Sequence, residues 1–494
     1  MKYGILISCY VALAGHQYGW VQGREIGEKG DKILFAAHAE RYSRVKNDSK
    51  LNKSIVNDLL HYGQPTKICY YEKPLLKTAR KLYSRQWPIF DNIKSHLADL
   101  GLNNIPIYYT NHHHAHAAMG YFTSNFEDAA ILVIDAIGEW NTTSLWHGKE
   151  NRLSRIMSVN YPHSFGIFYS ALTQAIGLKP NEEEYILMGM AAVGKPFYVK
   201  DLMNEFFAYF KPPYIKLRYN LHHGIGDYIK QKNWNLFDVA ASVQKIAEQY
   251  IVESSRYIKN QTKSKNLVLV GGVALNCVAN SNIRDNTIFE NIWVPPNPGD
   301  AGLSLGAILA HSNRHIEFDN AYLGYDIQRP LDVGGIIEEL VNNKIVGIAN
   351  GRAEWGPRAL GNRSLLADPR GNDIKDKVNT IKKREQFRPF APVVMAEHKE
   401  FYFKNCAYNQ EYMQYTNKCL YPQEFPAICH SDNTSRLQSV PANNSNIRRI
   451  LEAWYKRTNC PMLLNTSLNV KGEPLVNTWQ DAVRFMELND LRIY

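Results

Sequence analysis

Residues 127–146, EDAAILVIDAIGEWNTTSLW, decide the fold of this 494-residue chain. The apolar run 130–134 predicts a buried β-strand that ends at Asp135, and a turn containing glycine then leads into a second strand. Residues 266–283, NLVLVGGVALNCVANSNI, predict a similar arrangement, in which a strand is followed by a glycine pair and then by a helix. Strands that end in acids or glycines and alternate with helices predict a mixed α/β fold.

Segments on either side extend this pattern. Residues 238–258, DVAASVQKIAEQYIVESSRYI, carry apolar residues at helical spacing and predict a long helix. Residues 3–13 and 31–44 each predict a further strand. The whole arrangement is typical of an actin-like ATPase domain with two similar halves.

A composition shift divides the chain. We expect a first domain over residues 1–315, a linker over 316–328 and a second α/β domain over 329–494. The hydrophobic content of 45% is that of packed globular domains. No apolar run is long enough to span a bilayer, and the seven cysteines form no CxxC pair, so we expect a cytoplasmic protein with no membrane partner. The net charge of +10 fits a protein that meets phosphates, and it equally fits a lysine-rich composition without functional meaning.

Residues 111–122, NHHHAHAAMGYF, predict a metal site. His112 and His116 are four residues apart, so on a helix both imidazoles lie on one face and can bind one ion. Asp300, in the glycine-bracketed turn PGDAG, supplies a carboxylate for a site of two histidines and one acid, which suits iron(II) or zinc. The alternatives are a helix start stabilised by imidazoles and an aspartate that caps a helix.

Other residues of the first domain are candidates for ligand binding. Gly271 and Gly272 let the backbone approach a ligand closely, and the helix that follows Asn276 offers N–H groups to a phosphate or ribose. Such a pair is also common in plain strand–helix turns. Asp135 is placed to orient a ligand or bind substrate, or it simply forms a turn.

The second domain concentrates basic residues between aromatic residues and prolines. They are Arg352, Arg358, Arg363, Arg370, Lys382, Lys383, Arg384 and Arg388. Arginine forks match phosphate oxygens, and partly buried arginines need anions as partners, so we expect phosphate binding rather than a solvated basic face. Polar loops containing His430 and Arg436, and Asn465 and Ser467, complete the set. The sequence contains no Walker-type GxxxxGK[ST], GxSxG, HExxH or kinase signature, which excludes those classes.

Nine segments, in order along the chain, closely resemble the NodU/tobramycin carbamoyltransferase family. They are AERYSRVKNDS, HHHAHAA, DAIGEWNTTSLW, GGVALNCVANSNI, PNPGDAGLSLGA, GRAEWGPRALGNRSLLADPR, KKREQFRPFAP, HSDNTSRLQSV and LLNTSLNVKGEP. The resemblance implies an actin-like (ASKHA) metal-binding N-terminal domain and a YrdC-like C-terminal domain. It also implies that carbamoyl phosphate and ATP, with Mg²⁺, give a carbamoyl-adenylate whose carbamoyl group passes to an acceptor hydroxyl.

The resemblance also implies roles for individual residues. His112, His116 and Asp300 match the metal ligands, with Fe²⁺ the first candidate ion and Zn²⁺ the second. Residues that match the adenylate pocket or the carbamoyl phosphate and ATP side are Asp135, Gly271, Gly272, Asn276, Arg358, Arg384, Arg388, Arg436, Asn465 and Ser467. Asp135 and His113 are candidates for a general base, and Lys46 is a candidate to reach a phosphate.

The sequence leaves two kinds of acceptor molecule as alternatives. Charge favours a 5-hydroxymethylpyrimidine such as hydroxymethylcytosine, as a nucleotide or in DNA. The family's common use favours a sugar or another natural product. A third alternative is a non-catalytic tRNA-modification scaffold or nucleotide-binding regulator, which would bind metal and ATP without turnover.

Overall fold

The computed structural model of the chain describes residues 6–7, 22–24, 32–48, 51–84, 93–286 and 288–494. It divides into two units: unit 1 comprises Met1–Ala39 and Ser49–Asp319, and unit 2 comprises Glu40–Asp48 and Asn320–Tyr494. The mixed α/β class is confirmed, whereas the actin-like and YrdC-like assignments and the domain bounds stay predictions. The expected strand over residues 3–13 lies mostly outside the described residues.

The main sheet of unit 1 has the order β12-β11-β6-β7-β8, in which β12, β11 and β6 run parallel and β7 and β8 antiparallel to their neighbours. Its strands are β6 (Asp128–Gly138), β7 (Asn141–Lys149), β8 (Arg152–Asn160), β11 (Asn266–Val270) and β12 (Asn291–Trp293). The prediction that the first of these strands ends at Asp135 is wrong, because β6 continues to Gly138 and pairs there with β7.

Smaller strand groups complete unit 1. A parallel sheet contains β1 (Leu6–Ile7), β4 (Lys67–Tyr70) and β5 (Ile107–Tyr109), and two antiparallel pairs contain β2 (Gln22–Arg24) with β3 (Lys32–Phe35) and β9 (Phe207–Lys211) with β10 (Tyr214–Leu217).

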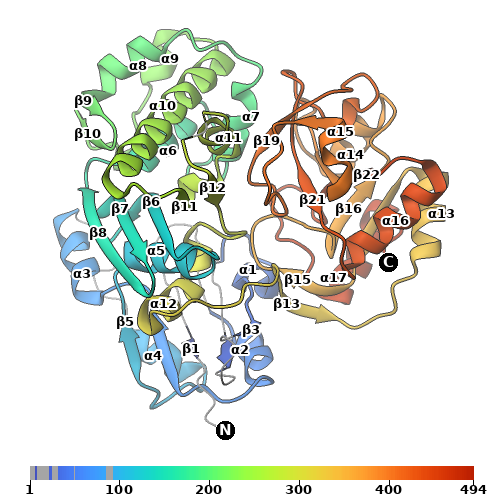
Figure 1. Ribbon diagram of the computed structural model, residues 1–494, viewed down its shortest axis with the longest axis horizontal. Helices are drawn as coiled ribbons and strands as arrows, with labels where there is room; N and C mark the ends of the chain where they lie inside the picture. Colours follow the sequence, from blue (N-terminus) through green and yellow to red (C-terminus); the bar gives the residue numbers. More distant parts are fainter. Residues whose placement is uncertain (1–5, 8–21, 25–31, 49–50, 85–92, 287) are drawn as a thin grey trace. The chain divides into compact units, whose positions relative to one another are not determined.

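Helices cover both faces of the main sheet, with α6 and α10 on one side and α5 and α12 on the other (Figure 1). The pleat of β7 follows this division, since Ser144 contacts α5 and the neighbouring Thr143 contacts α10. The helices of unit 1 are α2 (Lys53–Leu60), α3 (Pro74–Tyr83), α4 (Ile93–Asp99), α5 (His112–Phe122), α6 (Phe165–Ala175), α7 (Glu184–Ala191), α8 (Val199–Phe206), α9 (Tyr228–Lys232), α10 (Leu236–Thr262), α11 (Cys277–Asp285) and α12 (Leu303–Ser312), with short 3₁₀ turns η1 (Leu221–His223), η2 (Gly272–Leu275) and η3 (Asp300–Gly302). The long helix predicted over 238–258 is confirmed by α10.

Helix α5 is the element that positions the histidines. Every residue of α5 except His114 is buried, so the helix is packed on all sides. Its backbone approaches α12 closely, because Gly306 has no side chain where a Cβ atom would lie 2.2 Å from the carbonyl oxygen of Ala115. This close packing brings η3, which immediately precedes α12, next to the first turn of α5.

Unit 2 is built on a sheet of order β14-β16-β22-β17-β21. Its strands are β14 (Ile345–Ala349), β16 (Arg363–Ala367), β17 (Ala391–Met395), β21 (Gln438–Val440) and β22 (Met462–Ser467); two smaller sheets contain β13 (Tyr322–Ile327) with β15 (Gly351–Glu354), and β18 (Phe403–Lys404) with β19 (Thr416–Cys419) and β20 (Thr434–Arg436). The helices are α1 (Ala39–Ser43), α13 (Val333–Asn343), α14 (Ile374–Ile381), α15 (Lys399–Tyr402), α16 (Asn446–Thr458) and α17 (Trp479–Asn489), with 3₁₀ turns η4 (Ala396–His398) and η5 (Pro426–Ile428). The stretch expected as a linker therefore contains a strand, β13.

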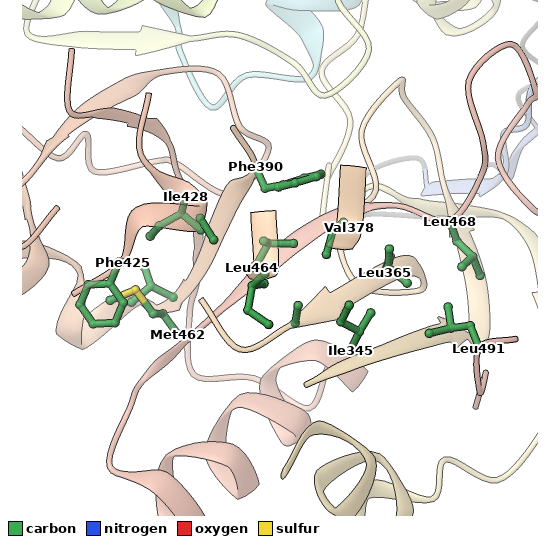
Figure 2. Packing of buried hydrophobic residues seen from close by; sticks show 14 of the residues in the cluster. Ile345, Leu365, Val378, Phe390, Phe425, Ile428, Met462, Leu464, Leu468 and Leu491 are labelled. Carbon is green, nitrogen blue, oxygen red and sulfur yellow. The ribbon is translucent and has the colours of Figure 1, made fainter. Parts of the chain in front are cut away.

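Both faces of the unit 2 sheet are buried. Along β22, Met462 and Leu464 belong to one apolar cluster, shown in Figure 2, and Leu463 between them belongs to the cluster on the opposite face. Continuous apolar strands such as IVGIA and MLLN follow from this two-sided burial. None of the described helices is long and apolar enough to span a bilayer.

The segment Glu40–Asp48 is held in unit 2 by its charged side chains. The buried guanidinium of Arg41 donates to the carbonyl oxygens of Glu354 and Gly356, the latter at 2.6 Å. Arg44 donates to the carbonyl oxygen of Pro474 at 3.1 Å and pairs with Asp481 at 3.4 Å. Nothing in the sequence anticipated that a segment so near the N-terminus packs with the C-terminal part of the chain.

Candidate metal centre and basic cluster

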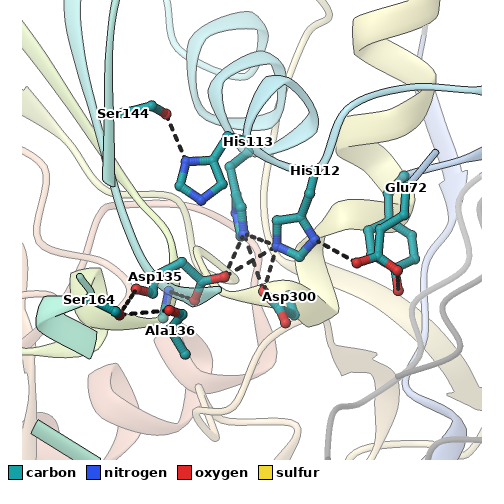
Figure 3. A network of polar contacts seen from close by, with 11 residues as sticks. Glu72, His112, His113, Asp135, Ala136, Ser144, Ser164 and Asp300 are labelled. Atoms are coloured by element: carbon teal, nitrogen blue, oxygen red, sulfur yellow. Dashed lines mark hydrogen bonds and ion pairs between the residues drawn. The ribbon is translucent and has the colours of Figure 1, made fainter. Parts of the chain in front are cut away.

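Two histidines and two aspartates converge inside unit 1. The Nε2 atoms of His112 and His116 are 3.2 Å apart, and Oδ1 of Asp300 lies 3.4 Å from the first and 3.2 Å from the second. Oδ2 of Asp135 lies 3.2 Å from His112 Nε2 and 3.7 Å from His116 Nε2. All four ligand atoms lie within 4.8 Å of one another, and Figure 3 shows the side chains of His112, Asp135 and Asp300 pointing to one place. We call this group the centre.

The backbone around the centre explains how the aspartates reach it. Asp135 is the last residue of the continuous buried run of β6, and its Oδ1 accepts a hydrogen bond from the amide of Gly272 at 3.2 Å. Gly271 has φ of +91°, and a Cβ atom there would lie 2.2 Å from the carbonyl oxygen of Ile134, so only glycine fits. The glycine pair predicted to approach a ligand therefore approaches Asp135 of the centre.

A second layer of polar residues lies behind His112. Oε1 of Glu72 lies 3.6 Å from its Nδ1 atom, while Oε2 of Glu72 pairs with Lys77 at 2.7 Å and accepts from Tyr71 at 3.1 Å. Gly138 packs directly on the imidazole of His112, since a Cβ atom at Gly138 would lie 2.2 Å from the ring. The ring is thus fixed in orientation with Nε2 toward the centre.

The charges of the centre are strongly interdependent. Burial opposes protonation of His112, but Asp300, Asp135 and Glu72 outweigh burial and raise its pKa well above the usual value. Burial would raise the pKa of Asp135, but its contacts with His112 and His116 lower it well below the usual value. The ionised Asp135 carboxylate is therefore buried against positively charged imidazole, and a bound cation would supply that positive charge with the imidazoles neutral.

The donor set fits a divalent metal ion. Two imidazole nitrogens and two carboxylate oxygens are the ligand types that iron(II) and zinc accept, and with neutral imidazoles the two carboxylates balance a charge of +2. The predicted ligands His112, His116 and Asp300 are brought together, and Asp135, predicted to act as a base or to bind substrate, joins them. The group is consistent with a metal site, and the identity of the metal is open.

His113 and Asn276 have other partners. Nδ1 of His113 lies 2.7 Å from the hydroxyl of Ser144, and burial together with His112 and His116 lowers its pKa well below the usual value, so this imidazole is neutral. The side chain of Asn276 accepts from the amide of Ala279 at 3.0 Å and exchanges two hydrogen bonds with Gln244. Asn276 therefore caps α11 and links it to α10.

Unit 2 contains the basic cluster that the sequence indicated, arranged around Lys382. The ammonium group of this buried lysine donates to the hydroxyl of Ser467 at 2.9 Å and to the carbonyl and side-chain oxygens of Asn469 at 2.8 and 2.9 Å. Burial, with Arg384 and Arg388 nearby, lowers the pKa of Lys382 well below the usual value. Arg384 lies over the ring of Phe390, 4.0 Å from its centroid. We call Lys382, Arg384, Arg388 and Ser467 the basic cluster.

The other predicted residues of unit 2 are spread over several elements. Arg358 is half-buried in the loop between β15 and β16, and Asn465 of β22 donates to Gln438 at 2.7 Å. Arg436 ends β20, and Nδ1 of His430 accepts from the amide of Ser431 at 2.9 Å. The ammonium group of Lys46 is paired with Glu40 at 2.9 Å.

Sequence reasoning missed Glu72, and it named Lys382 among the basic residues without predicting that this lysine is buried. Helical spacing could have indicated that Lys382 is buried, since it follows the buried Ile374 and Val378 of α14 at intervals of four residues. Glu72 lies at the end of the apolar stretch KICYYE, where a lone acid on a buried strand end was a usable signal.

Comparison with known proteins adds an independent finding. Residues 77–309 match the family model described as carbamoyltransferase N-terminus, and residues 337–494 match the model described as carbamoyltransferase C-terminus. The Synechocystis sp. protein sll1178 is 32% identical, covering 92% of this chain and 91% of its own length. Nodulation protein NolO of Bradyrhizobium diazoefficiens is 32% identical, covering 77% of this chain and 76% of its own. A crystal structure of full-length HypF in the phosphate- and nucleotide-bound form superposes with a TM-score of 0.36 at 12% identity, over 63% of this chain and 56% of that chain, a similarity too low to support an inference.

Proposed function

This chain belongs to the carbamoyltransferase family, and from that membership we propose that it is an ATP-dependent O-carbamoyltransferase that works in two steps. Unit 2 would form a carbamoyl-adenylate, and unit 1 would transfer the carbamoyl group to an acceptor hydroxyl. The observation that carries the proposal is the convergence of His112, His116, Asp135 and Asp300 within 4.8 Å, in a chain whose two halves match the two carbamoyltransferase models.

The two steps balance as follows. Carbamoyl phosphate, ATP and water give carbamoyl-adenylate, inorganic phosphate and pyrophosphate, so that a carbamate oxygen becomes bonded to the α-phosphorus and the bond between the α- and β-phosphates breaks. The acceptor oxygen then attacks the carbamoyl carbon, AMP leaves, and the hydroxyl proton is lost. The amide-like carbamoyl group is a weak electrophile, and AMP is a much better leaving group than hydroxide.

The basic cluster supports the first step. Arg384 and Arg388 present guanidinium forks suited to phosphate oxygens, and Lys382, whose pKa burial and these two arginines lower, would carry a third positive charge beside a bound phosphate. A phosphate-bearing ligand would offset the mutual repulsion of these cations. We therefore assign carbamoyl phosphate and the ATP phosphates, with Mg²⁺, to this cluster.

The centre supports the second step. His112, His116, Asp300 and Asp135 would hold the metal ion, with iron(II) as the first candidate and zinc as the second. The chemistry that a bound divalent ion supplies there is Lewis-acid polarisation of the carbamoyl carbonyl and neutralisation of phosphate charge. The burial of all four side chains excludes water, which would otherwise hydrolyse the activated intermediate. His113, neutral and one residue from a ligand, is the candidate base for the acceptor proton.

For the acceptor we propose the hydroxymethyl group of a 5-hydroxymethylpyrimidine, in a nucleotide or in DNA. The net charge of +10 favours such a phosphate-bearing partner over a neutral sugar. A small-molecule natural product is the alternative acceptor. The non-catalytic alternative is disfavoured by the full set of metal donors and by the basic cluster.

The test is mass spectrometry of reaction mixtures. Purified protein, ATP and carbamoyl phosphate are incubated with hydroxymethylcytosine nucleotide, with hydroxymethylcytosine DNA or with a panel of sugars, and the added carbamoyl mass is sought. A gain on DNA or nucleotide supports the proposed acceptor, and a gain on sugars alone removes it. His116→Ala should abolish transfer and leave carbamoyl-phosphate-dependent pyrophosphate release intact. Loss of both activities in a folded variant would contradict the division of labour between the units.

A further inference from the structure

Helix α3 of unit 1 buries basic side chains and exposes apolar ones. Its buried side chains are Lys77, Arg80 and Lys81, which share one face at helical spacing. Its outer face carries Leu75, which is 85% exposed, and Leu82, which is 55% exposed. A helix on the surface of a domain normally buries its apolar face, so the inward basic face needs an anionic partner.

Arg80 is the residue of this face that still needs an anion. Lys77 pairs with Glu72 of the second layer behind the centre. Arg80 is 8% exposed, its Nε atom is buried with no hydrogen-bond partner, and no ion pair involves its guanidinium in the part of the chain that the structure describes. A buried guanidinium N–H without an acceptor is costly, so an anion that accepts a hydrogen bond from it would stabilise the arrangement.

Aromatic rings lie next to this guanidinium. His222 of η1 is close enough for the charge of Arg80 to help burial lower its pKa. The ring of His222 lies 6.0 Å from that of Tyr161, which lies 6.3 Å from Tyr83, and Tyr83 lies 5.6 Å from Trp140. We call Tyr83, Trp140, Tyr161 and His222 the aromatic wall.

The wall and Arg80 are linked to His112 of the centre through intermediate residues. Trp140 follows Gly138 and Glu139, and Gly138 packs on the ring of His112. Arg80 is one helical turn from Lys77, whose partner Glu72 contacts His112 from behind. A ligand that held its anion at Arg80 and its ring against the wall would thus lie against the turn between β6 and β7, which packs on His112.

We propose that Arg80 and the aromatic wall form the acceptor subsite, and that the acceptor is an anionic aromatic compound, a nucleotide whose phosphate binds Arg80 and whose base stacks on Trp140 or Tyr83. This proposal rests on the proposed function and names the substrate class of the same enzyme. Guanidinium groups pair with phosphate oxygens, and bases stack on aromatic side chains whatever their identity. The phosphate can belong to a free nucleotide or to a DNA strand, and the test separates these sources.

The experiment compares ligands that differ by one phosphate. Calorimetric titrations of the full chain use 5-hydroxymethyl-dCMP, its neutral nucleoside, and a single-stranded oligonucleotide containing the same base. α,β-Methylene-ATP is present to occupy the nucleotide site proposed for unit 2. We expect wild type to bind the nucleotide about 10- to 100-fold more tightly than the nucleoside. Tighter binding of the oligonucleotide than of the mononucleotide points to DNA as the source of the phosphate.

Variants then assign the preference to Arg80. Arg80→Gln should remove the preference for the nucleotide, Arg80→Lys should keep part of it, and the exposed control Arg152→Gln should leave it unchanged. Thermal unfolding checks that each variant is folded. Equal affinity of wild type for nucleotide and nucleoside, or an unchanged preference in Arg80→Gln, overturns the proposal. If Arg80→Gln fails to fold, Arg80→Lys decides, since a point charge should bind phosphate less tightly than a fork.

Carbamoyl transfer is measured separately on the same ligands. A nucleotide that binds through Arg80 but gains no carbamoyl group would refute the proposed function and leave the anion subsite standing. Transfer to the nucleoside and the nucleotide with the same KM, each unaffected by Arg80→Gln, would refute the subsite and leave the function standing. A fall in transfer to both acceptors with unchanged acceptor KM would assign Arg80 to the adenylate phosphate and overturn the proposal.

Discussion

Nδ1 of His112 lies 3.6 Å from Oε1 of Glu72, on the side of the imidazole opposite the centre (Figure 3). A carboxylate in this place favours the tautomer that carries its proton on Nδ1 and leaves Nε2 free to bind a metal. Lys77 and Tyr71 in turn hold the Glu72 carboxylate at 2.7 and 3.1 Å. Glu72 is therefore a positioning residue, which acts on the centre through His112.

Replacing Glu72 with glutamine should weaken metal binding. The amide keeps the shape of the side chain but lacks the charge that orients His112, and changes of this kind cost about 10- to 100-fold in metal affinity. Competition with a chelator measures the affinity for Fe²⁺ or Zn²⁺. The exposed Glu182 provides the matched control, since Glu182→Gln should have no effect. An unchanged affinity in folded Glu72→Gln would show that the contact is incidental.

The same carboxylate should make stability depend on acid pH. Burial alone would raise the pKa of Glu72, but Lys77 and His112 outweigh burial and lower it to about 2. The unfolded chain therefore binds more protons at this group, so its contribution is complete above its ordinary pKa and is lost as pH falls toward 2. By about pH 4 wild type should lose about 1 kcal/mol from this group that Glu72→Gln does not lose. Urea unfolding with EDTA at near-neutral and acid pH measures both losses, and equal losses would contradict the pairing.

Two glycines with similar positive φ angles compare a site with open space to one that backbone atoms block. Gly271 has φ of +91° with the Ile134 carbonyl in the way of a Cβ atom, and Gly177 has φ of +89° with open space around it. Gly177→Ala should cost about 1–3 kcal/mol of unfolding free energy for the left-handed backbone alone. Gly271→Ala should cost more and also weaken metal binding, because Gly272 would shift away from Asp135. Equal losses of unfolding free energy in the two variants, with unchanged metal affinity, would show that the glycine pair does not support the centre.

The centre was partly predictable because its ligands lie in short segments with strong local patterns. The spacing of His112 and His116 requires only a helix, and α5 supplies it. Asp300 was paired with them on ligand chemistry and on a family resemblance, since no local rule brings η3 next to α5. The ligand position of Asp135 depends on β6 continuing past it in the sheet and on the amide of Gly272, both of which are tertiary features.

The strands and helices with strong periodicity were predictable for the same reason, as β11 and α10 show. The placement of Glu40–Asp48 in unit 2 was not, because it depends on hydrogen bonds from Arg41 and Arg44 to carbonyl groups several hundred residues away in sequence. Carbonyl acceptors carry no sequence signal. The burial of basic side chains in α3 also breaks the rule that periodic apolar residues face inward, which is why its basic face was not singled out.

Adjacent lysines provide the sharpest test of the basic cluster. Lys382 is buried with its ammonium among oxygens of Ser467 and Asn469, whereas Lys383 is exposed with φ of +51°. Under the proposed first step, Lys382→Met should reduce carbamoyl-phosphate-dependent pyrophosphate release by at least about tenfold, because a buried charge near the phosphates is lost. Lys383→Met should leave the rate near that of wild type. Metal affinity reports on the centre of unit 1 and should be unchanged in both variants. Similar rates for the two lysine variants would remove Lys382 from the cluster, and loss of metal binding in Lys382→Met would indicate misfolding beyond unit 2.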